Sequence, residues 1–170
     1  MSLDLQIRPE TADDRQAIEA VTIAAFAATD YKPREHLIVN ALRSSGQLTI
    51  SLVAEVDHRV VGHAAASPVG ISDGASGWFG LGPVSVVPDY QRRGIGSALV
   101  RQTLRALLGI GAAGCVVLGN PDYYGRFGFR ARAELRLPDI PPKYFQALLL
   151  GGDWTRGVVT YHEAFTAANL

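Results

Sequence analysis

The stretch Gln91-Arg92-Arg93-Gly94-Ile95-Gly96-Ser97-Ala98-Leu99 places two arginines and two glycines where an apolar strand gives way to a helix. Residues 81–87 before it have the β-branched character of a buried strand, which Pro88 ends. After it, apolar residues recur at the i, i+3, i+4 spacing of a helix with one buried face. Because glycine has no Cβ atom, Gly94 and Gly96 allow the backbone to approach a ligand closely. The amides of the first helical turn point outward, which predicts an anion-binding loop.

The neighbouring arginines strengthen this prediction, because Arg92 and Arg93 add charge-assisted donors to the backbone amides. The spacing excludes two common phosphate-binding loops. A Walker loop needs a lysine followed by Ser or Thr after its second glycine, and the two lysines, Lys32 and Lys143, lie far away in the sequence. The dinucleotide fingerprint needs a third small residue where Leu99 stands, so this second loop type fits poorly as well.

A second signature follows after one helix and the apolar strand 115–118. It covers residues 120–129 and places Tyr124 four residues before Gly128-Phe129, at the end of a short helix. The pattern Gln/Arg-x-x-Gly-x-Gly/Ala after a Val-rich strand, followed by this tyrosine, resembles the GNAT superfamily of N-acetyltransferases. The tail at 160–165 further resembles the small bacterial YhbS-like branch of that family.

The resemblance implies the acyl-CoA N-acyltransferase fold of the mixed α/β class. Such a fold has a central twisted mixed sheet, expected here with about seven strands, and helices on both faces. We expect residues 1–170 to form a single GNAT domain, because 170 residues with 48% hydrophobic content can build one sizeable core.

The order of elements along the chain agrees with this fold. Alternating and apolar runs predict strands at 3–7, 48–56, 59–71, 78–87, 115–118, 144–150 and 157–165. Helical spacing predicts helices after the capping pair Thr11 and Asp14, at 34–43, after Gly94, and in a short turn at 121–124. Asp57-His58 is expected to form a tight hairpin, and 131–142 to be mainly loop. The strands 78–87 and 115–118 are joined by a helix and should be parallel.

The strand 78–87 is expected to be irregular in its middle. Pro83 cannot donate to a β-ladder, and the glycines on either side of Leu81 weaken pairing, so part of the strand is free to bulge. Freed backbone groups of Val84, Ser85 and Val86 could then hydrogen-bond the pantetheine amides of the cofactor.

The resemblance implies roles for the residues that match the family motifs. Contacts to the pyrophosphate of acetyl-CoA are expected from Gln91, Arg92, Arg93, Gly94, Ile95, Gly96 and Ser97. Tyr124 is implied as the general acid for the departing thiolate, and the backbone N–H of Val86 as the donor to the oxyanion. Asn120 could contact the cofactor, although capping of the short helix that begins at Pro121 explains it as well.

The base that accepts the proton of the amine is not identified by the sequence. Many GNAT enzymes carry a glutamate on the strand equivalent to 78–87, but this strand holds no Glu or Asp. His63 has a side chain suited to neutral pH, but a lone histidine on a strand is more often structural, and Ser67, His162 or a water chain to Glu55 are no better founded. An amine that arrives neutral would need no base.

The predicted function is transfer of an acetyl group from acetyl-CoA to a primary amine, by direct transfer through a tetrahedral intermediate. No metal is expected. The alternatives are a non-catalytic acyl-CoA-binding or sensing domain and a nucleotide-binding regulatory module. Turnover with a panel of amines separates the first alternative from an enzyme, and a preference for ATP or NAD over coenzyme A would favour the second.

The composition of the chain limits the classes of binding partner that are expected. The formal net charge is zero, so no global field favours nucleic acid or an anionic membrane. The chain lacks a run of 18 uncharged apolar residues, and a cytoplasmic location is expected. A small-molecule or peptide amine is the expected acceptor, and the apolar closing strands permit a homodimer.

Overall fold

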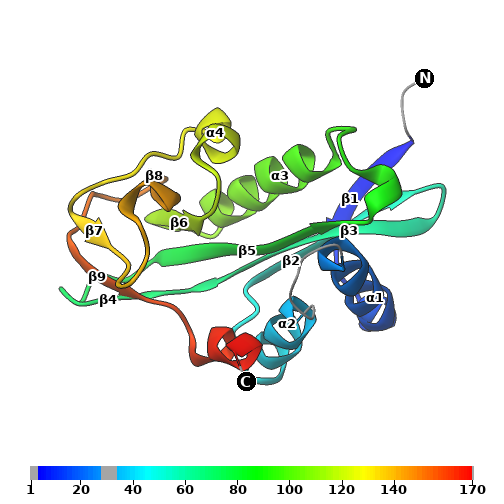
Figure 1. Ribbon diagram of the computed structural model, residues 1–170, viewed down its shortest axis with the longest axis horizontal. Coiled ribbons are helices and arrows are strands. Elements are labelled where there is room, and N and C mark those ends of the chain that lie inside the picture. Colours follow the sequence, from blue (N-terminus) through cyan, green and yellow to red (C-terminus); the bar gives the residue numbers. More distant parts are fainter. Residues whose placement is uncertain (1–3, 28–33, 170) are drawn as a thin grey trace. The chain divides into compact units, whose positions relative to one another are not determined.

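The computed structural model describes residues 4–27 and 34–169 (Figure 1). The strands are β1 (Leu5–Pro9), β2 (Ile50–Val56), β3 (Arg59–Pro68), β4 (Gly70–Ile71), β5 (Trp78–Val86), β6 (Gly114–Leu118), β7 (Leu135–Arg136), β8 (Phe145–Leu149) and β9 (Gly157–Thr160). The α-helices are α1 (Arg15–Phe26), α2 (Glu35–Ser44), α3 (Ile95–Gly109) and α4 (Pro121–Tyr124). Short 3-10 turns are η1 (Ala12–Asp14), η2 (Pro88–Tyr90), η3 (Gly125–Phe127), η4 (Pro142–Tyr144) and η5 (Glu163–Asn169).

The chain divides into two compact units. The first comprises Met1–Ala66, Pro83–Thr103 and Glu163–Leu170, and the second Ser67–Gly82 and Leu104–His162. Within the described residues, a six-stranded mixed sheet has the order β1-β2-β3-β5-β6-β8, and a three-stranded sheet has the order β4-β9-β7. The main sheet therefore has six strands where about seven were expected, because β9 pairs with β4 and β7 instead.

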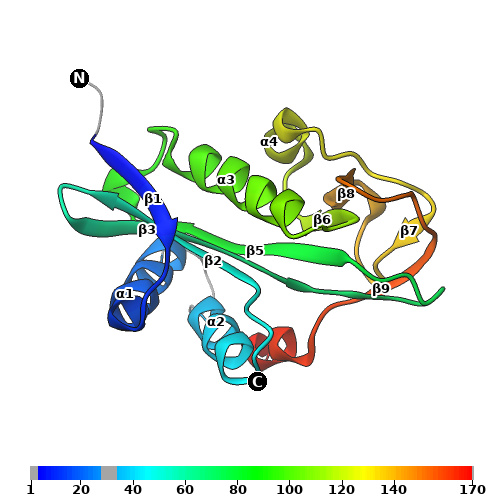
Figure 2. The same ribbon diagram turned by 180° about the vertical axis from the view of Figure 1, so that it is seen from behind.

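The first unit is built on the antiparallel strands β1, β2 and β3. Asp57 and His58 join β2 to β3 with φ values of 51° and 63°, which confirms the predicted tight hairpin. On one face, α1 and α2 cover the sheet, and Ile18, Val39 and Val53 form a buried cluster there. The start of α3 covers the opposite face (Figures 1 and 2). Helices on both faces were expected from the sequence.

The helix starts in this unit follow the predicted caps. Thr11 and Asp14 form a capping box at η1, immediately before α1. The Asp14 carboxylate also accepts two hydrogen bonds from Arg8, at 2.7 and 2.9 Å, and these donors hold its pKa well below the usual range. The box anchors the first helix to β1.

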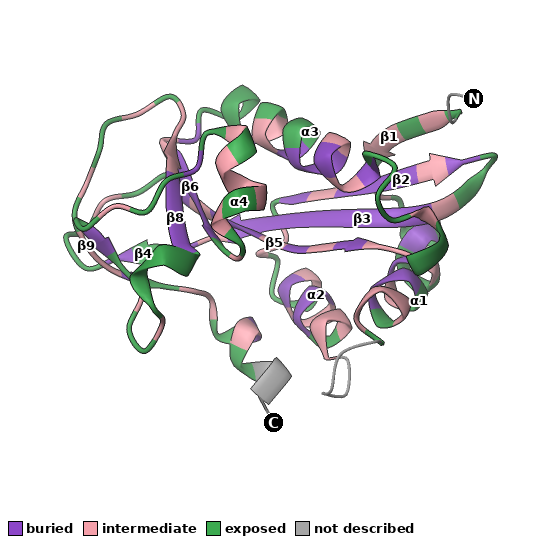
Figure 3. Ribbon diagram, turned by 45° about the horizontal axis from the view of Figure 1, so that its top comes forward, coloured by how far each residue is buried: buried purple, intermediate pink, exposed green. Residues whose placement is uncertain are grey.

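The second unit joins parts of both sheets through one apolar core. β6 pairs in parallel with β5 and antiparallel with β8, so the predicted parallel pair is confirmed. The core contains Trp78, Val116, Phe145 and Ala147 from the main sheet, and it includes Val159 of β9. Figure 3 shows β8 buried along its described length apart from its end.

Three stretches differ from the sequence prediction. The expected strand 59–71 is split into β3 and β4, because Pro68 has no N–H for the ladder. The expected strand 157–165 ends at Thr160 and is followed by η5, so a strand at 161–165 was wrong. The loop 131–142 holds the two-residue strand β7, which pairs in parallel with β9. No helix among the described residues has the length and apolar character to span a bilayer.

Candidate active site

The predicted anion-binding loop lies in the first unit, between the end of β5 and the start of α3. Its backbone is left-handed at Arg92, with φ 63°, and at Gly94, with φ 84°. At the start of the helix, the Ala98 N–H donates to the Gly94 carbonyl at 3.0 Å. The amides of Ile95 and Gly96 precede it, and helix geometry gives them no acceptor within α3. A left-handed turn leading into a helix N-terminus is an arrangement that binds anions.

The charge of the loop favours the same ligand. Gln91, Arg92, Arg93 and Gly94 are exposed, and the first turn of α3 holds no acidic side chain. The 15-residue helix places the positive end of its dipole here. The guanidinium of Arg93 lies over the ring of Tyr90 at 5.3 Å, which holds this charge beside the loop.

Gln91 has a structural partner that the sequence did not indicate. Its Nε2 donates to the carbonyl of Val86 at 2.9 Å, and so ties the loop back to the end of β5. The 3-10 turn η2 lies between them, with the Tyr90 N–H donating to the Val87 carbonyl at 2.9 Å. The loop therefore has a fixed attachment to the strand whose amides were predicted to bind the cofactor.

At the end of β5, the Ser85 side chain is buried between the half-buried Val84 and Val86. Ser85 is 1% exposed, and its Oγ has no hydrogen-bond partner among the described residues. The Val87 N–H donates to the Val61 carbonyl of β3 at 2.9 Å. Because successive amides of a strand point to opposite edges, the Val86 N–H points away from β3. Any contact of Ser85 to the cofactor is thus expected through its backbone.

In the second unit, the pairing of β5 with β6 is short. It covers Trp78↔Gly114, Phe79↔Cys115 and Gly80↔Val116, whereas β6 continues to pair with β8 as far as Leu118. Gly82 has a φ of 133°, a backbone conformation that favours glycine. The irregular middle of this strand was predicted from its proline and glycines. The short register supports that prediction.

Tyr124 lies at the end of α4, in a cluster of aromatic rings. The centroid of its ring lies 4.9 Å from that of Tyr123 and 6.0 Å from that of Phe129, and both pairs pack edge to face. Burial, followed by its neighbours Tyr123 and Cys115, raises the pKa of Tyr124 to about 12. The hydroxyl is therefore protonated throughout the physiological pH range and can act as a proton donor.

The space for the Tyr124 ring comes from Gly119, which was not among the predicted site residues. A Cβ atom built on Gly119 would stand 2.5 Å from Cε2 of Tyr124. Residues at the end of η4 and in β8 hold both the N–H and the carbonyl of Gly119. Its N–H donates to the Tyr144 carbonyl at 2.9 Å, and its carbonyl accepts from Nε2 of the buried Gln146 at 3.2 Å. Its position directly before the second signature was the available signal.

Asn120 caps α4. Its Oδ1 accepts the Asp122 N–H at 2.8 Å, and Pro121 follows at the first helical position. This is the structural explanation that the sequence left open. A contact to the cofactor stays a prediction.

His63 is a structural residue rather than a base in contact with solvent. It is fully buried on β3, and burial lowers its pKa to about 4. Its Nε2 lies 2.8 Å from the Ser51 hydroxyl, which in turn hydrogen-bonds to Glu10, the ion-pair partner of Arg43. Glu55 is likewise committed, through an ion pair with Arg8. Neither His63 nor Glu55 is therefore available to accept a proton from the amine.

Comparison with known proteins identifies the family. The model of the acetyltransferase (GNAT) domain matches residues 47–131, half of the chain. The sequence is 36% identical over 166 residues to the uncharacterized N-acetyltransferase YhbS of Escherichia coli (strain K12). This alignment covers 94% of this chain and 97% of that relative. The chain belongs to the GNAT acetyltransferase family.

Solved structures of GNAT proteins agree. A GNAT family acetyltransferase from Brucella melitensis, in complex with acetyl-CoA, is 47% identical, with a TM-score of 0.84 over 96% of this chain and 99% of that one. Escherichia coli YhbS in complex with CoA is 34% identical, with a TM-score of 0.86 over 98% and 94%.

Membership of the GNAT family makes this protein an N-acetyltransferase by class, and the resemblance to the YhbS-like branch is confirmed. The family match at 47–131 includes every residue predicted for the site. The individual roles of those residues stay predictions.

Proposed function

We propose that the protein transfers an acetyl group from acetyl-CoA to a primary amine of a small molecule or peptide, and that residues 1–170 act as one GNAT domain. The observation that carries this proposal is the turn at Arg92 and Gly94 followed by the open amides at the start of α3. The complexes of the Brucella melitensis and Escherichia coli relatives with acetyl-CoA and CoA support the choice of cofactor.

The loop 91–97 would hold the pyrophosphate. The amides of Ile95 and Gly96 donate to its oxygens, and the exposed guanidiniums of Arg92 and Arg93 neutralise its charge. Gln91 acts indirectly by fixing the loop to Val86. The backbone of Val84–Val86 would take the pantetheine amides as a partner strand does.

The chemistry would be a direct displacement. The neutral amine attacks the thioester carbonyl carbon, a C–N bond forms, and the Val86 N–H donates to the tetrahedral oxyanion. The C–S bond then breaks, the thiolate takes the proton of the Tyr124 hydroxyl, and the amine nitrogen loses its extra proton to water. The Tyr124 phenolate regains a proton from water, which restores the enzyme. The products are the acetylated amine and the thiol of coenzyme A.

The raised pKa of Tyr124 sets the energetic cost of its role. Against a thiol pKa of about 8.5, a tyrosine pKa of about 12 makes the proton transfer uphill by about 5 kcal/mol. Burial raises the pKa of a thiol as it does that of Cys115, so a thiolate leaving in a dry site narrows this gap. Tyr124 can therefore donate its proton at a lower energetic cost if the thiolate of coenzyme A is also shielded from water.

Strand β5 carries no Asp or Glu that could act as a base. His63 is buried and Glu55 is ion-paired with Arg8, so neither is available to accept the proton of the amine. We therefore infer that the amine binds in its neutral form. The rate should then rise with pH until the free amine is deprotonated, and the midpoint of the rise should follow the pKa of each acceptor used.

The test is release of the coenzyme A thiol from acetyl-CoA with polyamines, amino acids, aminoglycosides and peptides. The wild type should turn over at least one of these classes. Tyr124→Phe should lower kcat by roughly a hundredfold while changing the KM for acetyl-CoA less than threefold. Equal kcat values for the two proteins would remove the role of Tyr124 as acid, and coenzyme A binding without turnover across the panel would contradict catalysis.

A further inference from the structure

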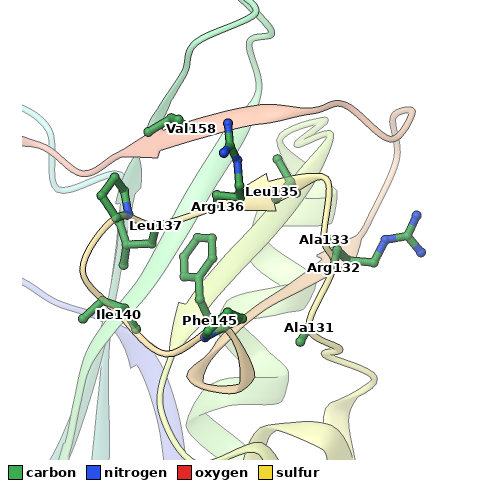
Figure 4. Close-up of a pocket in the computed structure, with 11 residues that line it drawn as sticks. Ala131, Arg132, Ala133, Leu135, Arg136, Leu137, Ile140, Phe145 and Val158 are labelled. Atoms are coloured by element: carbon green, nitrogen blue, oxygen red, sulfur yellow. The ribbon is translucent and has the colours of Figure 1, made fainter.

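The two units differ in the buried groups that could hold a polar molecule. In the second unit, the cavity under residues 131–142 is lined mainly by apolar side chains, and Figure 4 shows the guanidinium of Arg136 extending away from the Phe145 ring. In the first unit, Nδ1 of His63 and the hydroxyl of Ser85 have no hydrogen-bond partner among the described residues. His63 is fully buried and Ser85 is 1% exposed. Because an unpaired buried polar atom is unfavourable, each of these atoms is expected to have a partner in the folded protein.

His63 and Ser85 lie opposite each other on β3 and β5, which are neighbours in the main sheet. The Val87 N–H donates to the Val61 carbonyl at 2.9 Å, and a Cβ atom built on Gly62 would stand 3.1 Å from the Ser85 carbonyl. Residue numbers therefore fall along β5 as they rise along β3, so the strands are antiparallel and His63 pairs with Ser85. Directly opposite residues place their side chains on the same face of a sheet.

The face that carries both side chains is the one covered by α1 and α2. Val53 of β2 is the partner of His63 on its other side, and it packs in one cluster with Ile18 of α1 and Val39 of α2. The imidazole and the Ser85 hydroxyl are therefore enclosed between the sheet and these helices.

The hydrogen bonds of Ser51 decide which nitrogen of His63 carries the proton. The Ser51 hydroxyl has a single hydrogen, which it donates to the Glu10 carboxylate. It must therefore accept from Nε2 of His63, which lies 2.8 Å away. Burial keeps the ring neutral at physiological pH, with a pKa of about 4, so Nδ1 carries no hydrogen and can only accept. A donor is thus expected beside Nδ1.

We propose that one buried water molecule bridges the two groups, accepting a hydrogen bond from the Ser85 hydroxyl and donating one to Nδ1 of His63. The two side chains form no direct hydrogen bond, and internal waters commonly satisfy buried polar groups of this kind. The bridge completes a hydrogen-bonded chain of side chains from α2 to β5, consisting of Arg43, Glu10, Ser51, His63, the water and Ser85.

The water also positions part of the proposed acetyl-CoA site, a role that rests on the proposed function. The peptide group that follows Ser85 carries the Val86 N–H, the proposed donor to the oxyanion. Anchoring the Ser85 side chain to His63 fixes the direction of that N–H before the reaction begins. Ser85 and His63 are positioning residues in this role, because they act on the reaction through the Val86 N–H.

A high-resolution crystal structure of the protein tests the water without any cofactor. It should show one water at roughly 2.6–3.2 Å from both Oγ of Ser85 and Nδ1 of His63. Nitrogen NMR of the His63 ring should place the proton on Nε2, and Ser85→Ala should shift the Nδ1 resonance more than that of Nε2. A direct Ser85–His63 hydrogen bond, the absence of a water between them, or a proton on Nδ1 would overturn the proposal.

Thiol-release kinetics test the positioning role. Ser85→Ala should lower kcat by about tenfold and change the KM for acetyl-CoA less than twofold, because the oxyanion contact forms only in the transition state. Ser51→Ala breaks the same chain, so adding it to Ser85→Ala should cause little further loss. The matched control is Thr103→Val, which removes a buried hydroxyl that donates to the Leu99 carbonyl within α3 and should keep the wild-type kcat.

Thermal unfolding verifies that each variant is folded. Equal kcat values for Ser85→Ala and the wild type, a rise in KM as large as the fall in kcat, or the same loss in Thr103→Val would overturn the positioning role. No turnover by the wild type would contradict the proposed function instead, and the crystal structure would still decide whether the water is bound.

Discussion

At the scale of single residues, the position of Tyr124 depends on a side chain that is missing. Gly119→Ala would place a Cβ atom 2.5 Å from the tyrosine ring and push the hydroxyl away from its place. We predict that this substitution lowers kcat by roughly tenfold to a hundredfold, because small misplacements of catalytic groups have effects of that order. The measurement is steady-state release of coenzyme A thiol.

The control for this substitution is Gly70→Ala, where the nearest atom to the new Cβ is 3.9 Å away, an ordinary contact. It should leave kcat unchanged. In a Tyr124→Phe background, Gly119→Ala should have little further effect, because the hydroxyl that it displaces is already gone. A full additional loss in that background would show that Gly119 acts on something other than the hydroxyl.

His63 gives a prediction about stability and pH. Its pKa is about 4 in the folded protein, against about 6.5 when unfolded, so the unfolded state binds the extra proton between these values. Stability is therefore lost as pH falls from 6.5 to 4, by up to about 3 kcal/mol. Nearby Glu10 and Arg43 act on His63 in opposite directions and leave burial as the main cause.

His63→Gln removes this titration and keeps a polar group opposite Ser51. Urea unfolding at pH 7 and pH 4.5 should show a smaller loss of unfolding free energy for the variant than for the wild type. An identical loss in both proteins would mean that other groups, such as the carboxylates, control the pH dependence.

Residue roles could be predicted from the sequence only where a motif carries them. Tyr124 was selected over Tyr123 by its spacing to Gly128-Phe129, and the structure places it in a partly buried aromatic cluster. The bond from Gln91 to Val86 could not be read from spacing, because it depends on how the loop turns back. For His63 the structural interpretation was the favoured one, but its contact with Ser51 depends on how β2 pairs with β3 and could not be predicted from spacing.

At the scale of elements, the start of α3 carries the proposed cofactor contact. Gly96→Leu puts a large side chain into the first turn of the helix, where the phosphate is expected to approach the amides. We predict a rise of at least about tenfold in the KM for acetyl-CoA, equivalent to roughly 1.4 kcal/mol of binding. Thiol release at varied acetyl-CoA concentration measures it.

Gly109→Leu is the matched control, at the opposite end of the same helix. A Cβ atom there meets nothing within 4 Å, so the variant should fold and keep the wild-type KM. Equal rises in KM for both variants would indicate a general disturbance of α3 and would count against a pyrophosphate contact at Gly96.

Most elements could be predicted because local chemistry specifies them. The capping box at Thr11 and Asp14, the Asp57-His58 hairpin and the helix after Gly94 each follow from a few adjacent residues. The two-residue strand β7 could not, because only its pairing with β9 makes it a strand. The end of β9 at Thr160 was missed for a similar reason, since β4 offers only two residues to pair with.

At the scale of the whole molecule, net charge does not explain anion binding. The formal charge is zero, so the positive field must be local to the arginines of the loop and the N-terminus of α3. The first unit holds this loop and the second holds Tyr124. Continuous chain links them, since β5 and α3 each contribute residues to both units.

A ligand that binds only the folded chain stabilises it by mass action. Acetyl-CoA at 100 times its dissociation constant should raise the unfolding free energy by about 2.7 kcal/mol. ATP and NAD at the same concentrations should raise it less, which thermal unfolding in the presence of each ligand measures. Greater stabilisation by ATP or NAD would favour a nucleotide-binding module instead.

The most direct measurement is calorimetric titration of acetyl-CoA into the wild type and into Gly96→Leu. If backbone amides at the start of α3 hold the pyrophosphate, the wild type binds acetyl-CoA and the variant binds it at least about tenfold more weakly. No heat of binding to the wild type at millimolar acetyl-CoA, or equal affinities for the two folded proteins, would contradict the account.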